Sequence, residues 1–144
     1  MPPGQRVDPY RNFNFLVEIE GLAVGSFVEC SGLGSTTEVI ENPEGGVTTI
    51  LKMPGRTSYS DITLKWGLTD SQVLWEWRQQ IIDGNVVRKS GSVVVFDLAG
   101  SREVARWNFT GAWPSKWEGA AYSAKGNDIA IETLVLTLEK LSRV

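Results

Sequence analysis

Closely spaced acidic side chains are the residues of this sequence best placed to do chemistry. Glu38, Glu41 and Glu44 recur at intervals of three, and Asp61 follows near enough for folding to bring it to them. Such carboxylates could bind a divalent cation, but calcium needs several oxygens converging in a defined loop, and this spacing matches no EF-hand-like pattern. We interpret the group as solvated acids at a contact surface, and we expect neither a metal nor a cofactor.

A second possible chemistry is glycoside hydrolysis by two carboxylates, for which Glu103 and Glu118 are candidates. Nothing in the sequence brings this pair to one cleft. The chain has no histidine, so it lacks the usual zinc ligand and the usual general base near neutral pH. Its single cysteine, Cys30, cannot form an internal disulfide, and its neighbours offer nothing to lower the thiol pKa. We therefore expect a buried structural cysteine and no enzyme.

Charge and glycine spacing restrict the binding partners. The net charge is -3 at pH 7 with an isoelectric point near 5.0, and no basic run is present of the kind that neutralises phosphates. The glycines fit neither the Walker pattern nor the dinucleotide fingerprint and are typical of turns; they include Gly32, Gly34, Gly45 and Gly46. We expect no specific nucleic-acid binding.

Targeting signals are missing from the sequence as written. Its first residues lack the apolar segment of a signal peptide, and no stretch approaches the run of about 18 apolar residues that a membrane span requires. We expect synthesis in the cytoplasm without a signal peptide, and no stable membrane association. A chain of 144 residues with 42% hydrophobic content is expected to form a single domain, residues 1–144.

Period-two alternation dominates the chain and predicts strands. Apolar residues alternate from Phe13 to Ile19, and residues 23–30 are predicted as the hairpin partner of that strand. Residues 61–66 alternate in the same way and predict a further strand.

A second hairpin is predicted from residues 36–41 and 47–53, which flank a turn-forming group at residues 42–46. Neither arm has a clean hydrophobic face, so this hairpin is predicted to project from the body of the protein. Pro54 and Gly55 are predicted to interrupt the chain after it.

One helix is predicted after Thr69, which is a suitable N-cap with Gln72 completing a capping box. Gly84 is predicted to end the helix as a C-cap glycine. Apolar residues at helical spacing form its buried stripe, namely Val73, Leu74, Trp77 and Ile81.

The stretch from residue 103 to residue 119 is rich in aromatic residues and reads as a strand. Alternation places Trp107, Phe109 and Trp113 on one face, as a packing or assembly surface. Pro114 removes a hydrogen-bond donor and is predicted to end the strand, so that Trp117 folds back from the following turn.

A last long strand is predicted over residues 129–141, and neither of its faces is polar. Three leucines form one face, and the other consists of Ile131, Thr133, Val135 and Thr137. Something beyond the core should cover this second face, either a neighbouring subunit or the helix or a loop of the same chain. Together these elements predict an all-β fold with one helix: a small antiparallel β-barrel or sandwich flanked by the helix and the projecting hairpin.

Five segments in this order resemble the tube proteins of phage-tail-like contractile injection systems, which are related to contractile phage tail tube proteins and type VI secretion tube proteins. The segments are FNFLVEIEG (13–21), VECSGL (28–33), KMPG (52–55), EVARWNFTGAWPSKWEG (103–119) and NDIAIETLVLTLEKL (127–141). The resemblance covers nearly the whole chain. It implies a structural subunit whose six-membered rings stack into a tube, which sheath contraction drives through a target membrane.

The resemblance also implies partners and contact residues. The partners are other copies of the chain, a sheath protein, baseplate and terminator or cap proteins, and possible cargo in the lumen. The hairpin is expected to reach the adjacent ring through Glu38, Glu41, Glu44, Gly45, Gly46, Lys52, Pro54 and Arg56. Subunit packing is expected at Trp107, Trp113, Trp117, Ile131 and Val135. The alternatives are a baseplate-proximal or initiator copy of the tube protein and, with less support, a monomeric ligand-binding β-barrel.

Overall fold

The computed structural model describes residues 14–43, 45–46 and 48–144 of the chain. Its elements, in chain order, are β1 (Phe15–Ile19), β2 (Glu29–Ser31), β3 (Ser35–Asn42), β4 (Leu51–Tyr59), β5 (Ile62–Gly67), α1 (Val73–Ile82), β6 (Lys89–Phe96), β7 (Glu103–Glu118), β8 (Ile131–Thr137) and β9 (Lys140–Arg143). The predicted class, all-β with one helix, is confirmed. Phe13, predicted to begin the first strand, lies outside the described residues.

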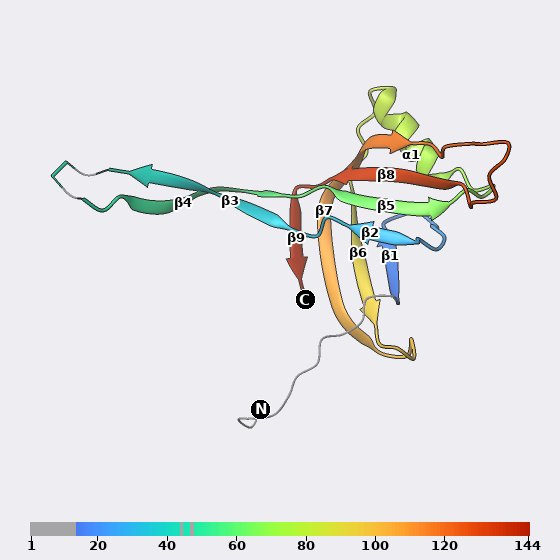
Figure 1. Ribbon diagram of the computed structural model, residues 1–144, viewed down its shortest axis with the longest axis horizontal. Helices are drawn as coiled ribbons and strands as arrows, with labels where there is room; N and C mark the ends of the chain where they lie inside the picture. Colours follow the sequence, from blue (N-terminus) through green and yellow to red (C-terminus); the bar gives the residue numbers. More distant parts are fainter. Residues whose placement is uncertain (1–13, 44, 47) are drawn as a thin grey trace.

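Seven strands form one antiparallel sheet with the order β1-β6-β7-β8-β5-β2, and β9 pairs with β7. The sheet does not close into a barrel, because β1 and β2 remain at its two edges (Figure 1). The prediction that residues 23–30 pair with the first strand is wrong: β1 pairs with β6, and the short β2 pairs with β5. Pairing strands that are adjacent in sequence costs the least loop-closure entropy, but here contacts between residues far apart in the sequence decide the pairing.

The long strand β7 turns the sheet around on itself. Its first half pairs with β6 and β9, and its second half pairs with β8. The register shifts where Gly111, with φ of 65°, forms a bulge opposite β6. A bulge reverses the faces of the residues that follow it, so Phe109 is buried while Trp113 lies on the opposite face. The prediction that Trp107, Phe109 and Trp113 share one face is therefore wrong for Trp113.

Two prolines predicted to break strands lie inside them. Pro114 is buried within β7 and pairs with Leu136, directly before a register shift, and Pro54 lies in β4 beside another. Register shifts and edge strands tolerate proline because the missing N–H has no ladder partner to lose there. The continuous β7 also carries Trp117 within the strand and not in a turn.

The core lies between the two halves of the bent sheet and is closed by α1. Alternate residues of β1, β5 and β8, together with the leucine just after β8, supply most of it, as predicted: Val17, Ile19, Ile62, Leu64, Leu134, Leu136 and Leu138. The predicted strand at residues 129–141 divides in two, because β8 ends at Thr137 and β9 begins at Lys140.

Helix α1 packs on β7 and contributes Leu74 and Trp77 to the core. The Trp77 indole N–H donates to the Val87 carbonyl at 2.8 Å. Gly84 follows the last turn with φ of 89°, which confirms its predicted role at the C-terminal end. The predicted capping box is wrong, because Gln72 occupies the N-cap position without a side-chain hydrogen bond. At ten residues, α1 is too short to cross a membrane, and the described part of the chain holds no helix that could.

Candidate functional site: an assembly surface

The β3–β4 hairpin stands away from the rest of the protein (Figure 1). Every residue of β3 is exposed, and β4 is nearly as open. The hairpin carries seven of the eight predicted inter-ring residues, namely Glu38, Glu41, Gly45, Gly46, Lys52, Pro54 and Arg56; Glu44 lies outside the described residues. Two strands alone are marginally stable in water. A hairpin of this kind is therefore suited to contact another molecule.

The hairpin has two different faces near its tip. Ile40 pairs with Met53 and Asn42 with Leu51, which places three apolar side chains on one face. We call Ile40, Leu51 and Met53 the hairpin apolar face. Glu41 pairs with Lys52 on the opposite face. Neither arm has a clean hydrophobic face along its own sequence; the apolar face forms because cross-strand pairing gathers residues from both arms, while Val39 and Pro54 pair on the opposite face.

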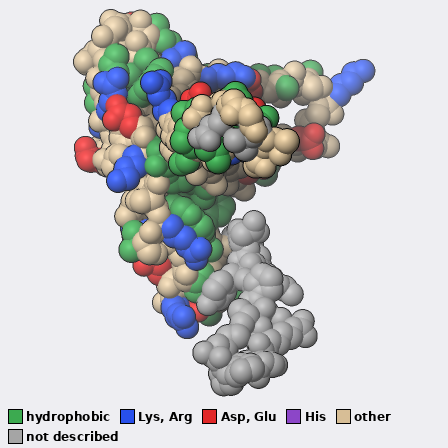
Figure 2. Space-filling view, turned by 90° about the vertical axis from the view of Figure 1, so that its left-hand side faces the viewer, with side chains coloured by type: hydrophobic (Ala, Val, Ile, Leu, Met, Phe, Trp, Pro, Cys, Tyr) green, Lys and Arg blue, Asp and Glu red, His purple; other side chains and the backbone are tan. Residues whose placement is uncertain are grey.

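Seen from the hairpin side, hydrophobic side chains reach the surface of this projection (Figure 2). On the body behind it, basic and acidic side chains are interspersed and do not form a continuous basic patch. No group of three potential metal ligands occurs within the described ranges. The geometry of this face suits a protein contact.

The two carboxylates considered from the sequence for glycoside hydrolysis do not form a catalytic site. Glu103 and Glu118 are the first and last residues of β7, so they do not face one cleft. Each carboxylate pairs locally, Glu103 with Arg106 and Glu118 with Lys116, both at 2.7 Å. The hydrogen bond from Lys116 lowers the pKa of Glu118 below its usual value. These carboxylates hold surface ion pairs.

Cys30 lies in β2 opposite Leu64 and is partly buried. Burial, with a smaller contribution from the neighbouring Glu29, raises the pKa of its thiol to about 11. A thiol with such a pKa is a poor nucleophile at neutral pH. This agrees with the structural role expected from the sequence.

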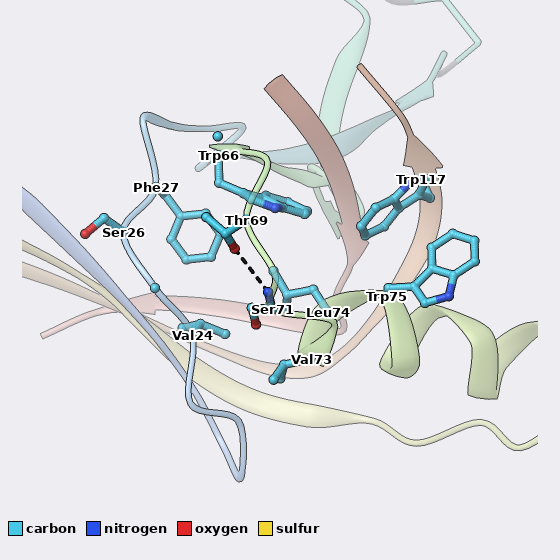
Figure 3. Close-up of a pocket in the computed structure, with 12 residues that line it drawn as sticks. Val24, Ser26, Phe27, Trp66, Thr69, Ser71, Val73, Leu74, Trp75 and Trp117 are labelled. Carbon is cyan, nitrogen blue, oxygen red and sulfur yellow. Dashed lines mark hydrogen bonds between the residues drawn. The ribbon is translucent and has the colours of Figure 1, made fainter. Parts of the chain in front are cut away.

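Four aromatic rings gather where β5, α1 and the end of β7 meet (Figure 3). Trp66 contacts Phe27 and Trp117 with ring centroids 5.8 Å and 5.4 Å apart, and Trp75 contacts Trp117 at 5.1 Å, all edge to face. The adjoining cavity measures about 90 Å³. Sites for small organic ligands usually enclose roughly 300 to 1,000 Å³. The cavity is too small for the sugar or apolar ligand of the alternative reading.

The remaining predicted packing residues lie on other parts of the sheet. Trp107 is half-buried, and the Arg143 guanidinium lies 5.3 Å from its ring centroid. Trp113 pairs with Thr137, and Val135 lies between Thr63 and Lys116 on the outer face of β8. Ile131 pairs with Gly67 at the end of β5. Because α1 joins the core on the opposite side, it does not cover the outer face of β8.

A family model for the T4-like virus tail tube protein gp19 matches residues 11–142. The chain belongs to this family. It is therefore a tail tube protein, which is a structural protein, as the sequence resemblance implied. No curated protein matches the chain in sequence.

Solved structures agree with this assignment of the tail tube protein. It is 26% identical to a chain in the "PVC sheath-tube complex in extended state" of an extracellular contractile injection system, with a TM-score of 0.86 over 94% of this chain and 91% of that chain. It is 25% identical to a chain in the anti-feeding prophage cap, the "AFP tube terminating cap", with a TM-score of 0.87 over 97% and 93%. Hcp1 from Flavobacterium johnsoniae, at 18% identity and a TM-score of 0.52 over 89% and 94%, shares the fold.

Proposed function

We propose that this tail tube protein is the inner-tube subunit of a contractile injection system, in which six copies form a ring and the rings stack into a hollow tube. The family match over nearly the whole chain carries this proposal. It is supported by similarity to chains of the PVC sheath-tube complex and the AFP tube terminating cap. On sheath contraction the tube would pass through a target membrane as a conduit or cargo container.

The ring would form between the two open sheet edges. Strands β1 and β2 end the sheet on opposite sides, and among the described residues the outer backbone N–H and C=O groups of each have no ladder partner. Pairing one edge with the other edge of a neighbour is a heterologous contact, which closes into a ring when the rotation fits. Trp107, Trp113, Trp117, Ile131 and Val135 remain our candidates for packing between subunits.

Stacking of rings would use the β3–β4 hairpin. Its exposure along the whole of β3 and its extension beyond the core suit a contact with an adjacent ring. We assign this contact to the hairpin residues named from the sequence, Glu44 included. A stacking contact is also heterologous, but it stays open and generates a filament.

The wider assembly follows from the same proposal. The tube would be enclosed by a sheath protein and bounded by baseplate and terminator or cap proteins, with possible cargo in its lumen. The chain would act as one domain over residues 1–144, without enzymatic activity. The subunits would then be built into a phage-tail-like particle.

Electron microscopy of the purified chain, together with its mass in solution, tests the proposal. We expect six-membered rings or stacked tubes. A strict monomer across concentrations would contradict a main tube subunit. It would favour an initiator copy that needs a partner, or a monomeric binding module.

The role of the hairpin has its own test. Gly46 has φ of 84°, which proline cannot adopt, so Gly45→Pro with Gly46→Pro should disrupt the hairpin turn. We expect rings that no longer stack and an unchanged fold of the body. Gly100→Pro, at the turn between β6 and β7 with φ of 69°, is the matched control and should leave stacking intact. Tubes of normal length from the hairpin variant would contradict the assigned role.

A further inference from the structure

One face of the strands β1, β6, β7 and β9 is polar over much of its area. The pairing of these strands sets four polar residues in one row, because Glu18 pairs with Ser92, Ser92 with Asn108 and Asn108 with Ser142. A second polar row runs beside the first. We call the two rows the polar sheet face, which consists of Glu18, Glu20, Ser90, Ser92, Asn108, Thr110, Lys140 and Ser142.

The polar sheet face is hollowed between β1 and β7. The hollow measures about 370 Å³, a size that is usual for binding sites. Its lining includes Glu18, Glu20, Ser90, Ser92, Asn108 and Thr110. The Ser92 hydroxyl donates to Asn108 Oδ1 at 2.7 Å, so the N–H groups of the Asn108 amide remain for an acceptor on another molecule. The hollow therefore offers hydrogen-bonding groups to a polar partner.

The charge of this hollow is set by its carboxylates. The one cation beside them, Arg106, is held by Glu103 at 2.7 Å and by Glu18 at 3.7 Å. Lys140 lies on β9, three strand spacings or roughly 14 Å from Glu20 on the other edge of the polar sheet face. No ion pair to Glu20 occurs among the described residues. The hollow should therefore attract basic groups and repel phosphates.

The proposed tube places this face toward the lumen. The core lies on the other side of the four strands, where Val17, Val93 and Phe109 pack with residues of α1, β5 and β8. In a closed ring the bulkier side of each subunit takes the larger radius, because the circumference grows with the radius. The polar sheet face is then on the inside, where a water-filled channel requires polar side chains.

We propose that the polar sheet face lines the lumen and binds cargo polypeptides through their lysine and arginine side chains. The inference rests on the proposed tube function and names the chemical class of its cargo. Basic side chains of the cargo pair with Glu18 and Glu20, and its peptide groups form hydrogen bonds with Ser92 and Asn108. Each contact is weak, but every subunit repeats it, so the contacts act together. Nucleic acid is excluded, because its phosphates would meet the carboxylates.

Binding of labelled oligomers, followed by fluorescence anisotropy, tests the charge of the cargo. We expect the wild-type chain to bind an oligoarginine peptide in a salt-dependent manner, and to bind neither oligoglutamate nor oligothymidylate. Glu18→Gln with Glu20→Gln should weaken oligoarginine binding by about tenfold. Glu29→Gln with Glu118→Gln is the matched control, because it removes the same charge from exposed carboxylates paired with Lys65 and Lys116, and it should bind as the wild type does.

A biotin label tests the position of the face. Thr110 is exposed on the polar sheet face, so a biotinylated Thr110→Cys chain should bind streptavidin when it is unassembled. In tubes of the same chain, electron microscopy should show no streptavidin along the outer wall. Wild-type chain treated in the same way controls for labelling of the partly buried Cys30.

The outcomes separate this inference from the proposed function. A wild-type chain that forms neither rings nor tubes would contradict the function, whereas binding of oligoarginine can still be measured on that chain. Equal binding by the two double variants, or preferred binding of oligothymidylate, would overturn the basic cargo. Streptavidin along the tube wall, or loss of tubes from Glu18→Gln with Glu20→Gln, would overturn the lumenal position and leave the tube function standing.

Discussion

Replacing Gly91 by alanine should displace the edge strand β1, because no room exists for a methyl group at this position. Gly91 lies in β6 and pairs with Ile19 of β1 and Phe109 of β7. A Cβ atom built on it would lie 2.8 Å from Phe109 Cε2 and even closer to Phe109 Cζ and the Glu18 carbonyl oxygen, where ordinary contact begins at 3.4 Å.

The cost follows from what could move to relieve this overlap. The Glu18 carbonyl belongs to the backbone and cannot rotate away, and the Phe109 ring is fully buried. Overpacking of a core typically costs about 1 to 3 kcal/mol, and we expect the upper end, about 3 kcal/mol, since one of the obstacles is backbone. For a chain of this length, each kcal/mol lowers the melting temperature by about 2 to 4 °C. Gly91→Ala should therefore melt roughly 6 to 12 °C below the wild type.

Thermal unfolding followed by circular dichroism measures this difference. Gly119→Ala is the control, because no atom lies within 4 Å of its added Cβ and its φ is not positive. All variants must be compared at one protein concentration, since assembly stabilises the folded chain by mass action. A Gly91→Ala protein that melts within about 1 °C of the control would refute the close approach of β1 and β7 to β6. Loss of rings in this variant would further agree with β1 as a ring-forming edge.

Other predictions concern the core and the thiol. Trp77 is 1% exposed, so Trp77→Ala should lower the free energy of unfolding, measured with urea, by about 3 to 5 kcal/mol. Trp77→Phe should lower it less, although this variant loses the hydrogen bond to Val87. A loss below about 1 kcal/mol for the alanine variant would contradict the packing of α1. Because the Cys30 pKa of about 11 lies above the unfolded value of 9.0, its thiol should react with iodoacetamide at pH 8 roughly a hundredfold more slowly than in the unfolded chain. The folded state binds this proton more tightly than the unfolded state, so the contribution of the Cys30 thiol to the free energy of unfolding is complete below pH 9 and declines toward pH 11. Cys30→Ser should remove that decline. An equal decline in both proteins would refute the raised pKa of Cys30.

Local patterns gave the helix and several strands correctly. The helix can be recognised from neighbouring residues, because its signals span only one or two turns. These signals are the apolar stripe that includes Leu74 and Trp77, and Gly84 after the last turn. The alternation in β5 and the spacing of Leu134 and Leu136 in β8 likewise report which side of each strand is buried. The projecting hairpin was also recognisable, although its apolar face was not, because that face depends on the register between two strands.

Local sequence patterns give wrong predictions at the prolines and in the aromatic stretch. Pro54 and Pro114 look like strand breakers, but each lies beside a register shift, and a shift depends on the partner strand. Alternation predicts Trp113 on the face of Phe109, because no neighbouring residue indicates the bulge at Gly111. Trp75 received no role, because its aromatic partner Trp117 lies on β7, far along the chain.

The sequence by itself determined the secondary-structure class, the buried residues of β1, β5 and β8 and, through segments spread over the whole chain, the family. Only the tertiary structure decided that β1 pairs with β6 and not with the segment after it, that the sheet stays open at β1 and β2, and that Ile40, Leu51 and Met53 gather on one face of the hairpin. The physical reason is the range of the interactions. Side-chain periodicity and turn preferences act over a few residues, whereas strand partners, bulges and exposed surfaces are set by contacts between residues far apart in the chain.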